Sequence, residues 1–314
     1  GNTASTANAS SLYPDSGTFA VTLLVTNGNG CSDDSVRNVV VKLSPTASAT
    51  TNDTTGCNPY TSTFVNNSIN ATSYNWNFGD GGTSTQANPT HTYPGTGNFT
   101  VTLIATNTAG CRDTFVFNNT IQVNQTPLAS FTASTVTGCA PLNVNFTNTS
   151  TVTSGATYFW DFGNGNTSTV ANPSAVFADS GTYQVVLNVN NGNGCTHTAS
   201  QLITVNISPT ALALTTDTAG CTPHAVSFIN NSTNATSYQW NFGNGATSTA
   251  VSPSYTYTTG GLMTVTLIAS NSAGCRDTLV LPYQINVKQS PRARFNMSPT
   301  LGCTPLNVNF TNTT

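Results

Sequence analysis

Apolar and polar residues alternate in short runs along the chain, which is the pattern of strands with one buried face. Tyr74, Trp76 and Phe78 alternate with asparagines, and a glycine-rich turn follows at residues 79–82. A second alternating run spans residues 99–105, and no stretch keeps helical spacing over ten residues. The pattern therefore predicts an all-β fold of short strands separated by turns.

The same pattern returns together with two series of cysteines at nearly constant spacing. The first series recurs every 82 residues, and the second recurs after 80, 84 and 80 residues. The first series is Cys57, Cys139, Cys221 and Cys303, and the second series is Cys31, Cys111, Cys195 and Cys275. A period of this length is too long for a solenoid repeat and suits one small domain. About seven short strands per period predict tandem Ig-like β-sandwiches, arranged as beads on a string.

Two kinds of domain alternate, because a shift of 164 residues aligns the sequence better than a shift of 82. The segment CAPLNVNFTNTS at Cys139, for example, returns as CTPLNVNFTNTT at Cys303. We call the two kinds type A and type B. The predicted order is a partial type B domain at 1–43, type A at 44–125, type B at 126–207, type A at 208–289 and a partial type B domain at 290–314.

We expect this sequence to be a stretch of a longer array within an assembly, because both of its ends fall inside a type B domain. An alternative stays open, in which separate subunits complete these domains by exchanging strands. Residues 292–314 of one subunit would then pair with residues 1–43 of the next, and the equivalents of residues 151–164 would be missing.

Composition excludes several classes of function. Charged residues make up only 5% of the chain and the net charge is −3, so no basic surface is expected for nucleic acid. No apolar run is long enough to span a membrane, so no membrane insertion is predicted. Eight cysteines accompany only three histidines, at different places in the repeat, which favours disulfides over metal sites. Regular disulfides indicate an extracellular or cell-surface protein, and no cofactor is expected.

The run YNWNFGDG at 74–81, with the later segments HTY and NFTVTL, resembles the polycystic-kidney-disease (PKD) domain. The hallmark residues of its core recur in every complete domain, as Trp76, Phe78, Trp160, Phe162, Trp240 and Phe242. This chain departs from the family at Asn164 and Asn244, where Asp80 keeps the family aspartate, and it keeps the family histidine only as His91. Similar cysteine-bearing arrays occur in very long bacterial surface proteins, including gliding-motility adhesins exported by type IX secretion. The resemblance implies a bacterial, extracellular array.

Candidate chemistry is sparse. The three tryptophans could form a sugar-stacking ladder, but their parity with neighbouring Tyr and Phe residues favours the core. Asp80 and Asp161 lie nearest the hallmark turn and have no partner at acid/base spacing. Because asparagine replaces Asp80 in the other domains, we expect a turn role for this position. Ten acidic residues are too few for an extensive calcium system, and no catalytic motif is present, so no enzyme is predicted.

Three triplets of aspartate, Ser or Thr, and an aliphatic residue are similar to a bacterial O-glycosylation signal. They make Ser35, Thr218 and Thr278 candidate modification sites. Asn-x-Ser/Thr triplets are also abundant, but a composition this rich in Asn, Ser and Thr produces them by chance.

Strand direction bears on the disulfide pairing. Pairs within a domain, such as Cys57 with Cys111, are the simplest scheme. One cysteine, however, precedes the second strand and the other follows the sixth, and both strands run the same way. Strands of six to ten residues would separate the two cysteines by roughly 20–33 Å, whereas a disulfide spans about 7 Å between Cα atoms. Chain entropy favours neither scheme, since both close loops worth about 4–5 kcal/mol.

Pairs between successive domains are therefore favoured, because the first-series cysteine lies where the chain leaves a domain and the second-series cysteine where it enters. The predicted bonds are Cys57–Cys195 and Cys139–Cys275. Cys221 would pair with the Cys31 equivalent of the following segment, and Cys111 with the Cys303 equivalent of the preceding one.

We expect a non-enzymatic structural region of an extracellular fibre, stalk or adhesin, stiffened by these bonds, whose partners are neighbouring copies of the same repeat. The alternative is a set of accessory modules that bind polysaccharide or a surface. That function needs exposed aromatic residues at a repeating position, and Tyr60, Tyr93 and Tyr255 do not recur in register.

Overall fold

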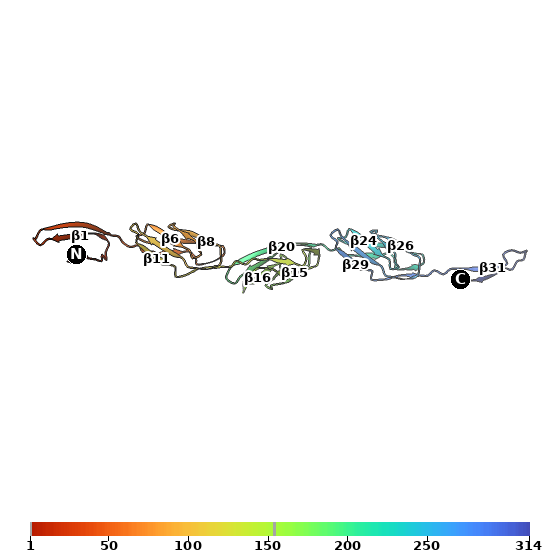
Figure 1. Cartoon of the computed structure of the whole chain (residues 1–314). Coiled ribbons are helices and arrows are strands. Elements are labelled where there is room, and N and C mark those ends of the chain that lie inside the picture. Colours follow the sequence, from red (N-terminus) through yellow and green to blue (C-terminus); the bar gives the residue numbers. More distant parts are fainter. Residues whose placement is uncertain (1, 153–154) are drawn as a thin grey trace. The chain divides into compact units, whose positions relative to one another are not determined.

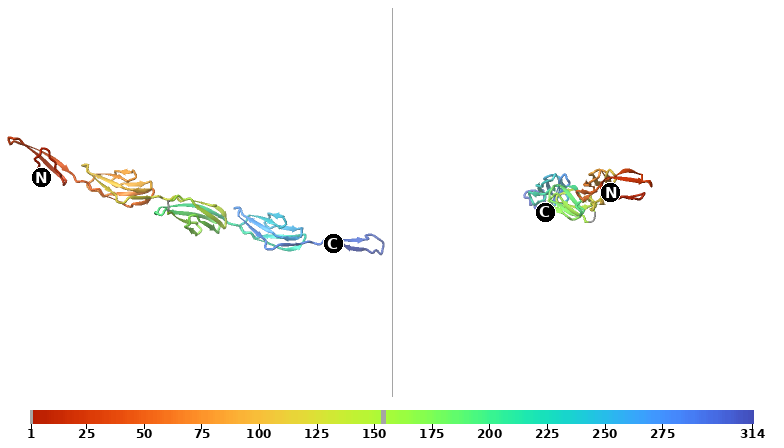
Figure 2. Two further views of the ribbon diagram at one scale, coloured as in Figure 1. Left: turned by 60° about the horizontal axis from the view of Figure 1, so that its bottom comes forward. Right: turned by 90° about the vertical axis from the view of Figure 1, so that its left-hand side faces the viewer.

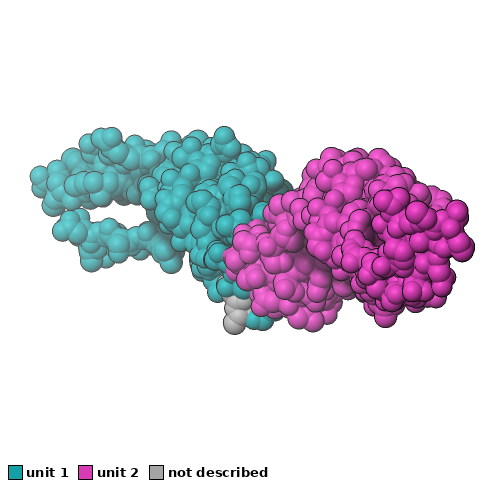
Figure 3. Space-filling model, turned by 90° about the vertical axis from the view of Figure 1, so that its right-hand side faces the viewer, with its two compact units in different colours: residues 1–128, 151–157, 189–197 teal, residues 129–150, 158–188, 198–314 magenta. Residues whose placement is uncertain are grey.

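The computed structural model describes residues 2–152 and 155–314 (Figure 1). Residue 1 of the predicted 1–43 domain and residues 153–154 of the predicted 126–207 domain lie outside the described part. Contacts between Cα atoms divide the chain into two compact units, which are described separately (Figure 3). The first unit comprises residues 1–128, 151–157 and 189–197, and the second comprises residues 129–150, 158–188 and 198–314.

The first complete domain is a sandwich of short strands. Its sheets have the orders β3-β5-β8, β11-β10-β6-β7 and β4-β12-β9. The strands are β3 (Ala49–Thr51), β4 (Thr55–Cys57), β5 (Tyr60–Asn66), β6 (Ser73–Asn77), β7 (Thr83–Ser84), β8 (Thr90–Tyr93), β9 (Gly97–Phe99), β10 (Thr102–Thr106), β11 (Arg112–Val116) and β12 (Ile121–Asn124). The all-β Ig-like prediction is confirmed. The strands are more numerous than the seven expected, because long runs divide between sheets.

The alternating run at 99–105 shows why these strands are divided. In the first domain β9 pairs with β12, whereas β10 pairs with β6. The chain therefore passes from one sheet to another between Phe99 and Thr102, while the burial alternation continues through Val101, which is fully buried. In the middle domain the equivalent run is one continuous strand, β19.

The middle domain repeats the architecture with fewer interruptions. Its sheets have the orders β13-β15-β18 and β14-β20-β19-β16-β17. The strands are β13 (Phe131–Ala133), β14 (Thr137–Cys139), β15 (Leu142–Asn148), β16 (Thr157–Asp161), β17 (Thr167–Ser168), β18 (Ser174–Phe177), β19 (Gly181–Asn190) and β20 (Thr196–Asn206).

The third domain has the same three sheets as the first, with the orders β21-β23-β26, β25-β24-β28-β29 and β22-β30-β27. The strands are β21 (Ala213–Thr215), β22 (Ala219–Cys221), β23 (His224–Asn230), β24 (Ser237–Asn241), β25 (Thr247–Ser248), β26 (Ser254–Tyr257), β27 (Gly261–Met263), β28 (Thr266–Ser270), β29 (Arg276–Val280) and β30 (Ile285–Lys288). The identical sheet orders match the type A sequence that both domains carry.

Two hairpins flank the complete domains. β1 (Gly17–Thr26) pairs with β2 (Ser32–Val41), and β31 (Phe295–Ser298) pairs with β32 (Asn309–Asn312), each as a two-stranded sheet (Figures 1 and 2). Their sequences are those of parts of a type B domain. Their apolar residues are largely exposed: Leu23 is 63% exposed, whereas its equivalent Leu187 in the middle domain is fully buried.

The core of each complete domain is built around one tryptophan. Trp76, Trp160 and Trp240 are all fully buried. Each indole N–H donates a hydrogen bond of 3.0 Å to the carbonyl ten residues later, so burial leaves no indole donor unpaired. In the first domain the Trp76 ring packs 5.6 Å from Phe64 of the facing sheet. The alternating residues of the sequence thus meet between two layers, as predicted.

In the first and third domains a buried tyrosine packs in the core and is hydrogen-bonded to the residue just before the hallmark turn. The Tyr93 hydroxyl donates to the Phe78 carbonyl and the Tyr257 hydroxyl to the Phe242 carbonyl. Burial raises the pKa of Tyr93 well above its ordinary value and that of Tyr257 to about 12, because a phenolate would be poorly solvated in the core. Tyr93 is fully buried and is unavailable for sugar stacking.

The first glycine of the hallmark turn meets a steric requirement that the second does not. Gly79 has φ +86°, and a Cβ there would lie 2.6 Å from the backbone oxygen of Thr100. Gly81 has φ +95°, but a Cβ there would meet nothing within 4 Å. Both positions disfavour a side chain, and only the first also requires close approach of another strand.

We predict that Gly79→Ala destabilises the first domain more than Gly81→Ala does. Left-handed strain costs about 1–2 kcal/mol at either site, and overpacking adds about 1–3 kcal/mol at Gly79 only. Hydrogen exchange of peptides from residues 60–106, read by mass spectrometry, measures the loss within this domain. Equal acceleration of exchange in the two variants would contradict this account.

Candidate functional site

The position of the first-series cysteines follows from a parallel strand pair in every complete domain. β4 runs parallel to β12, with Cys57 opposite Asn124, the last residue of the domain's last strand. β14 pairs with β20 and β22 with β30 in the same way. Because parallel strands end at the same edge, the first-series cysteine lies where the chain leaves its domain.

The second-series cysteines lie in the turn at the opposite end, where the chain enters. Cys111 lies between β10 and β11, and the neighbouring Asn107 Nδ2 donates to the carbonyl of Leu43 in the entering linker at 2.7 Å. Asp113 Oδ2 accepts a 2.8 Å hydrogen bond from the backbone N–H of Ala47. The entering chain is therefore held beside the second-series cysteine.

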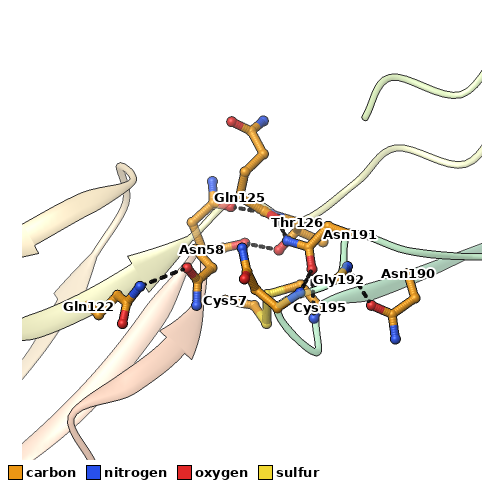
Figure 4. The surroundings of a disulfide bond; sticks show 11 residues. Cys57, Asn58, Gln122, Gln125, Thr126, Asn190, Asn191, Gly192 and Cys195 are labelled. Carbon is orange, nitrogen blue, oxygen red and sulfur yellow. Dashed lines mark hydrogen bonds between the residues drawn. A yellow bond between two sulfur atoms is a disulfide. The ribbon is translucent and has the colours of Figure 1, made fainter. Parts of the chain in front are cut away.

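The structure joins the two series in the pairs favoured from strand direction. Cys57 is bonded to Cys195 with a Cα separation of 5.7 Å, and both belong to the first compact unit (Figure 4). Cys139 is bonded to Cys275 with the same Cα separation, and both belong to the second unit. Each bond links residues more than 130 positions apart, in consecutive repeats.

Hydrogen bonds support the Cys57–Cys195 bond on both sides (Figure 4). Asn58, directly after the cysteine, donates its N–H to the Asn124 carbonyl at 3.0 Å. Thr126 of the linker donates from its N–H and its hydroxyl to Asn58, both at 2.7 Å. Asn191 donates from Nδ2 to the carbonyl of Gln125, so the linker is bonded to both domains.

The Cys139–Cys275 bond has equivalent surroundings within the second unit. Ala140 donates its N–H to the Asn206 carbonyl at 2.9 Å, and the Ser208 hydroxyl donates to the Ala140 carbonyl. Asn271 Nδ2 donates to the Ile207 carbonyl at 2.7 Å. Three of the hydrogen bonds thus recur at equivalent positions in the two joints, whereas the bond from the Thr126 N–H to the Asn58 side chain has no counterpart at Ala140.

An asparagine lies four residues before each second-series cysteine, and its role was not predicted from the sequence. Its side chain has two roles: Oδ1 accepts the backbone N–H of the cysteine, and Nδ2 donates to the linker. The residues are Asn107, Asn191 and Asn271, and Asn27 has the same Oδ1 contact. Asp277, which accepts the N–H of Ala211 at 2.7 Å, was also missed. The constant Asn-x-x-Gly-Cys spacing was the available signal.

The remaining four cysteines are not bonded to one another. Cys31, Cys221 and Cys303 are exposed and Cys111 is partly buried. The scheme that pairs them with flanking segments stays a prediction.

The turn role expected for Asp80 and its asparagine equivalents is confirmed. Oδ1 of Asp80, Asn164 and Asn244 each accepts the backbone N–H two residues later. The residue two positions before the first hallmark glycine behaves alike, since Asp161 Oδ1 accepts the N–H of Gly163 at 2.9 Å. Amide and carboxylate oxygens are equivalent acceptors here, which explains the exchange of Asp for Asn.

The first domain adds a hydrogen bond between two side chains to this turn. Asp80 Oδ2 lies 2.7 Å from His91 Nε2, whose ring stacks on Phe78 at 4.1 Å. The third domain replaces the pair by Asn244 and Tyr255, joined at 3.0 Å. Partial burial raises the pKa of the Asp80 carboxyl, but the hydrogen bonds with His91 and from the Gly82 N–H lower it more, so that the pKa lies below its ordinary value.

The candidate glycosylation residues Ser35, Thr218 and Thr278 are all exposed, and their modification stays a prediction. Among residues 2–152 and 155–314 no cluster of three His, Cys, Asp or Glu side chains has the arrangement of a metal site. The same residues include no helix long and apolar enough to cross a membrane.

We predict that digestion without reduction yields the crosslinked peptides Cys57–Cys195 and Cys139–Cys275. Pepsin at acidic pH suits the experiment, because only seven Lys and Arg residues are present and acid suppresses thiol exchange. Cys111→Ser serves as the control and leaves both crosslinks in place. A Cys57–Cys111 peptide would contradict the interdomain pairing.

We predict that the Asp80–His91 contact makes the first domain acid-sensitive. A lowered carboxyl pKa stabilises the fold above about pH 4, and this contribution is lost as the pH falls through the folded-state pKa. The pair lies near the surface and is worth less than about 1 kcal/mol. The variant Asp80→Asn/His91→Tyr copies the third domain. Its free energy of unfolding, measured with urea, should fall less on acidification than that of the unaltered protein. An identical pH dependence in both proteins would disprove the assignment.

Comparison with known proteins is consistent with this geometry. Residues 42–123, 124–207 and 206–287 each match the family model described as PKD domain. A similar solved structure is the PKD1 domain of the Vibrio cholerae metalloprotease PrtV, 37% identical, covering 26% of this chain and 98% of that one, with a TM-score of 0.23. The PKD1 domain of Vibrio anguillarum Epp is 33% identical, with 27% and 98% covered and a TM-score of 0.24.

A structure concerning host cell surface retention of a 1.5-MDa bacterial ice-binding adhesin is also similar. It is 14% identical, with 80% of this chain and 100% of that chain covered, and its TM-score is 0.27. The three family matches together span most of the sequence, and they coincide with the three complete sandwiches. The chain therefore belongs to the PKD domain family, as an array of three tandem PKD domains.

Proposed function

We propose that this PKD array is a structural stretch of an extracellular fibre, stalk or adhesin, in which disulfides between successive domains limit bending. PKD domains are non-catalytic modules, and PKD domains with disulfides are suited to a secreted or extracellular protein. The observation that carries the proposal is the placement of Cys57–Cys195 and Cys139–Cys275, each of which joins one repeat to the next.

A second covalent connection changes the mechanics of a joint. Domains joined only by a linker move relative to one another by default. Here the first and middle domains are joined both by the linker that contains Gln125 and by the Cys57–Cys195 bond. The Asn191 side chain also donates a hydrogen bond to the linker at Gln125. Rotation about the linker would break these hydrogen bonds and stretch the disulfide, so bending is restricted to small angles.

The composition supports a role in contacts that do not depend on charge. With only 5% charged residues, the surface consists mainly of hydroxyl, amide and scattered aliphatic groups. Contacts between such surfaces change little with ionic strength. We include neighbouring repeats and a polysaccharide or other surface among the proposed partners, and a bacterial adhesin of the gliding-motility kind as the proposed setting.

We predict that loss of the paired cysteines makes the array flexible. The variant Cys57→Ser/Cys195→Ser/Cys139→Ser/Cys275→Ser should show a broader distribution of interdomain distances in small-angle X-ray scattering. The matched control is Cys31→Ser/Cys111→Ser/Cys221→Ser/Cys303→Ser, which removes as many cysteines but keeps both interdomain disulfides. Compared as size-selected monomers, this control should scatter like the unaltered protein. Hydrogen exchange verifies that the domains stay folded. If the two variants scatter alike, the proposed stiffening is wrong.

A further inference from the structure

The first-series cysteine of each complete domain sits in a defined acceptor surface. We use the name acceptor pole for this cysteine, the residue after it and the hydroxyl residue of the following linker. At Cys57 the acceptor pole comprises Asn58 and Thr126, and at Cys139 it comprises Ala140 and Ser208. In both cases a loop of the next repeat covers the pole, and Cys195 and Cys275 are only 1% exposed there.

The third domain has the same acceptor pole without an occupant in the described residues. Cys221 lies opposite Lys288 in the parallel pair, and Thr222 donates its N–H to the Lys288 carbonyl at 2.9 Å. The Ser290 hydroxyl donates to the Thr222 carbonyl, as Thr126 does to Asn58. The carbonyl of Gln289, which is equivalent to that of Gln125, makes no hydrogen bond within the described part of the chain.

The chain also carries an unoccupied loop of the type that docks on such poles. Residues 27–31 read NGNGC, the same five residues as 191–195. Asn27 Oδ1 accepts the N–H groups of Asn29 and Cys31, both at 3.0 Å, which is the bonding of the docked loop. Asn27 Nδ2 makes no hydrogen bond within the described residues, and Cys31 is exposed.

We propose that the Cys221 acceptor pole binds loop 27–31 of a second copy of this chain and forms a disulfide with its Cys31. Asn27 Nδ2 then donates to the Gln289 carbonyl, as Asn191 donates to Gln125. The domain types agree with this pairing, because Cys221 belongs to a type A domain and loop 27–31 to a type B domain. The Cys57–Cys195 bond likewise joins a type A domain to a type B loop. The inference deepens the proposed function, on which it rests, by naming the partner through which the fibre extends.

Exposed apolar side chains on the two flanking hairpins support a second copy of this chain as the partner of the Cys221 acceptor pole. In the middle domain Phe146 and Leu187 are buried, and the partly buried Phe131 packs against Phe146. The equivalents in the flanking hairpins are Phe295, Phe310 and Leu23, which are 61%, 67% and 63% exposed. The proposed bond brings residues 290–314 of one copy beside residues 1–43 of the other, where these side chains can bury one another.

The bond forms by thiol–disulfide exchange with a small-molecule disulfide such as oxidised glutathione. The Cys31 thiolate attacks glutathione disulfide and releases one glutathione thiolate. The Cys221 thiolate of the other copy then attacks Sγ of Cys31 in the mixed disulfide and releases the second. Two protein thiols are oxidised and one glutathione disulfide is reduced to two thiols, so electrons and protons balance.

The test uses the full chain with Cys111→Ser/Cys303→Ser, in which Cys31 and Cys221 are the remaining unpaired thiols. In a glutathione redox buffer we expect covalent dimers and longer polymers that reduction dissolves, with Cys31–Cys221 as the crosslinked peptide. Adding Cys31→Ser or Cys221→Ser should abolish the polymers. Asn27→Ala should slow crosslinking about tenfold, because the Asn27 hydrogen bonds are lost, whereas Asn29→Ala should leave the rate unchanged.

Three outcomes would overturn the inference. They are monomers only, a Cys31–Cys221 bond within one copy, and a chance mixture in which like cysteines pair as readily as unlike ones. If the crosslink fails while Cys57–Cys195 and Cys139–Cys275 are present, the proposed function stands and only this inference falls. If those internal bonds are absent, both fall.

Discussion

The parallel pairing of a short strand with the last strand of each domain is the constraint on which the other features depend. Because β4 runs parallel to β12, Cys57 lies opposite Asn124, at the end of the domain where the chain leaves it. An antiparallel pair over the same residues would place Cys57 opposite Gln122 instead, two residues back from the exit. The direction of this short strand therefore places the cysteine where it can bond to the next domain.

The side chains that stabilise turns also restrict the linkers between domains. An asparagine that would ordinarily only stabilise its own loop also donates to the linker carbonyl, so one side chain links loop shape to linker position. Backbone groups in an exposed linker would otherwise bond to water at little cost. Their pairing with Asn191, Thr126 and Asn58 restricts the linker without a large apolar interface, which suits a chain with few residues available for burial.

Much of the fold could be predicted from the sequence, because strand alternation and turn composition are local properties. The burial of Trp76, Trp160 and Trp240 follows from their parity with Phe residues, and the turn role of Asp80 follows from its replacement by asparagine. The division of the 99–105 run between two sheets was missed, since a continuous alternation does not reveal which partner each half pairs with. Asn191 was missed for the same reason: its partner is in the linker, 66 positions away.

The sequence by itself determined the period, the alternation of two domain types and the core face of each strand, because repeats and period-2 alternation are properties of the residue order. Strand direction also led to the interdomain scheme for the cysteines. Only the tertiary structure decided which residues surround each disulfide. It also decided that Cys221 and loop 27–31 keep the same local geometry although neither has a partner among the described residues. Such relations depend on which strand ends share a pole, and that is set by packing between segments far apart in sequence.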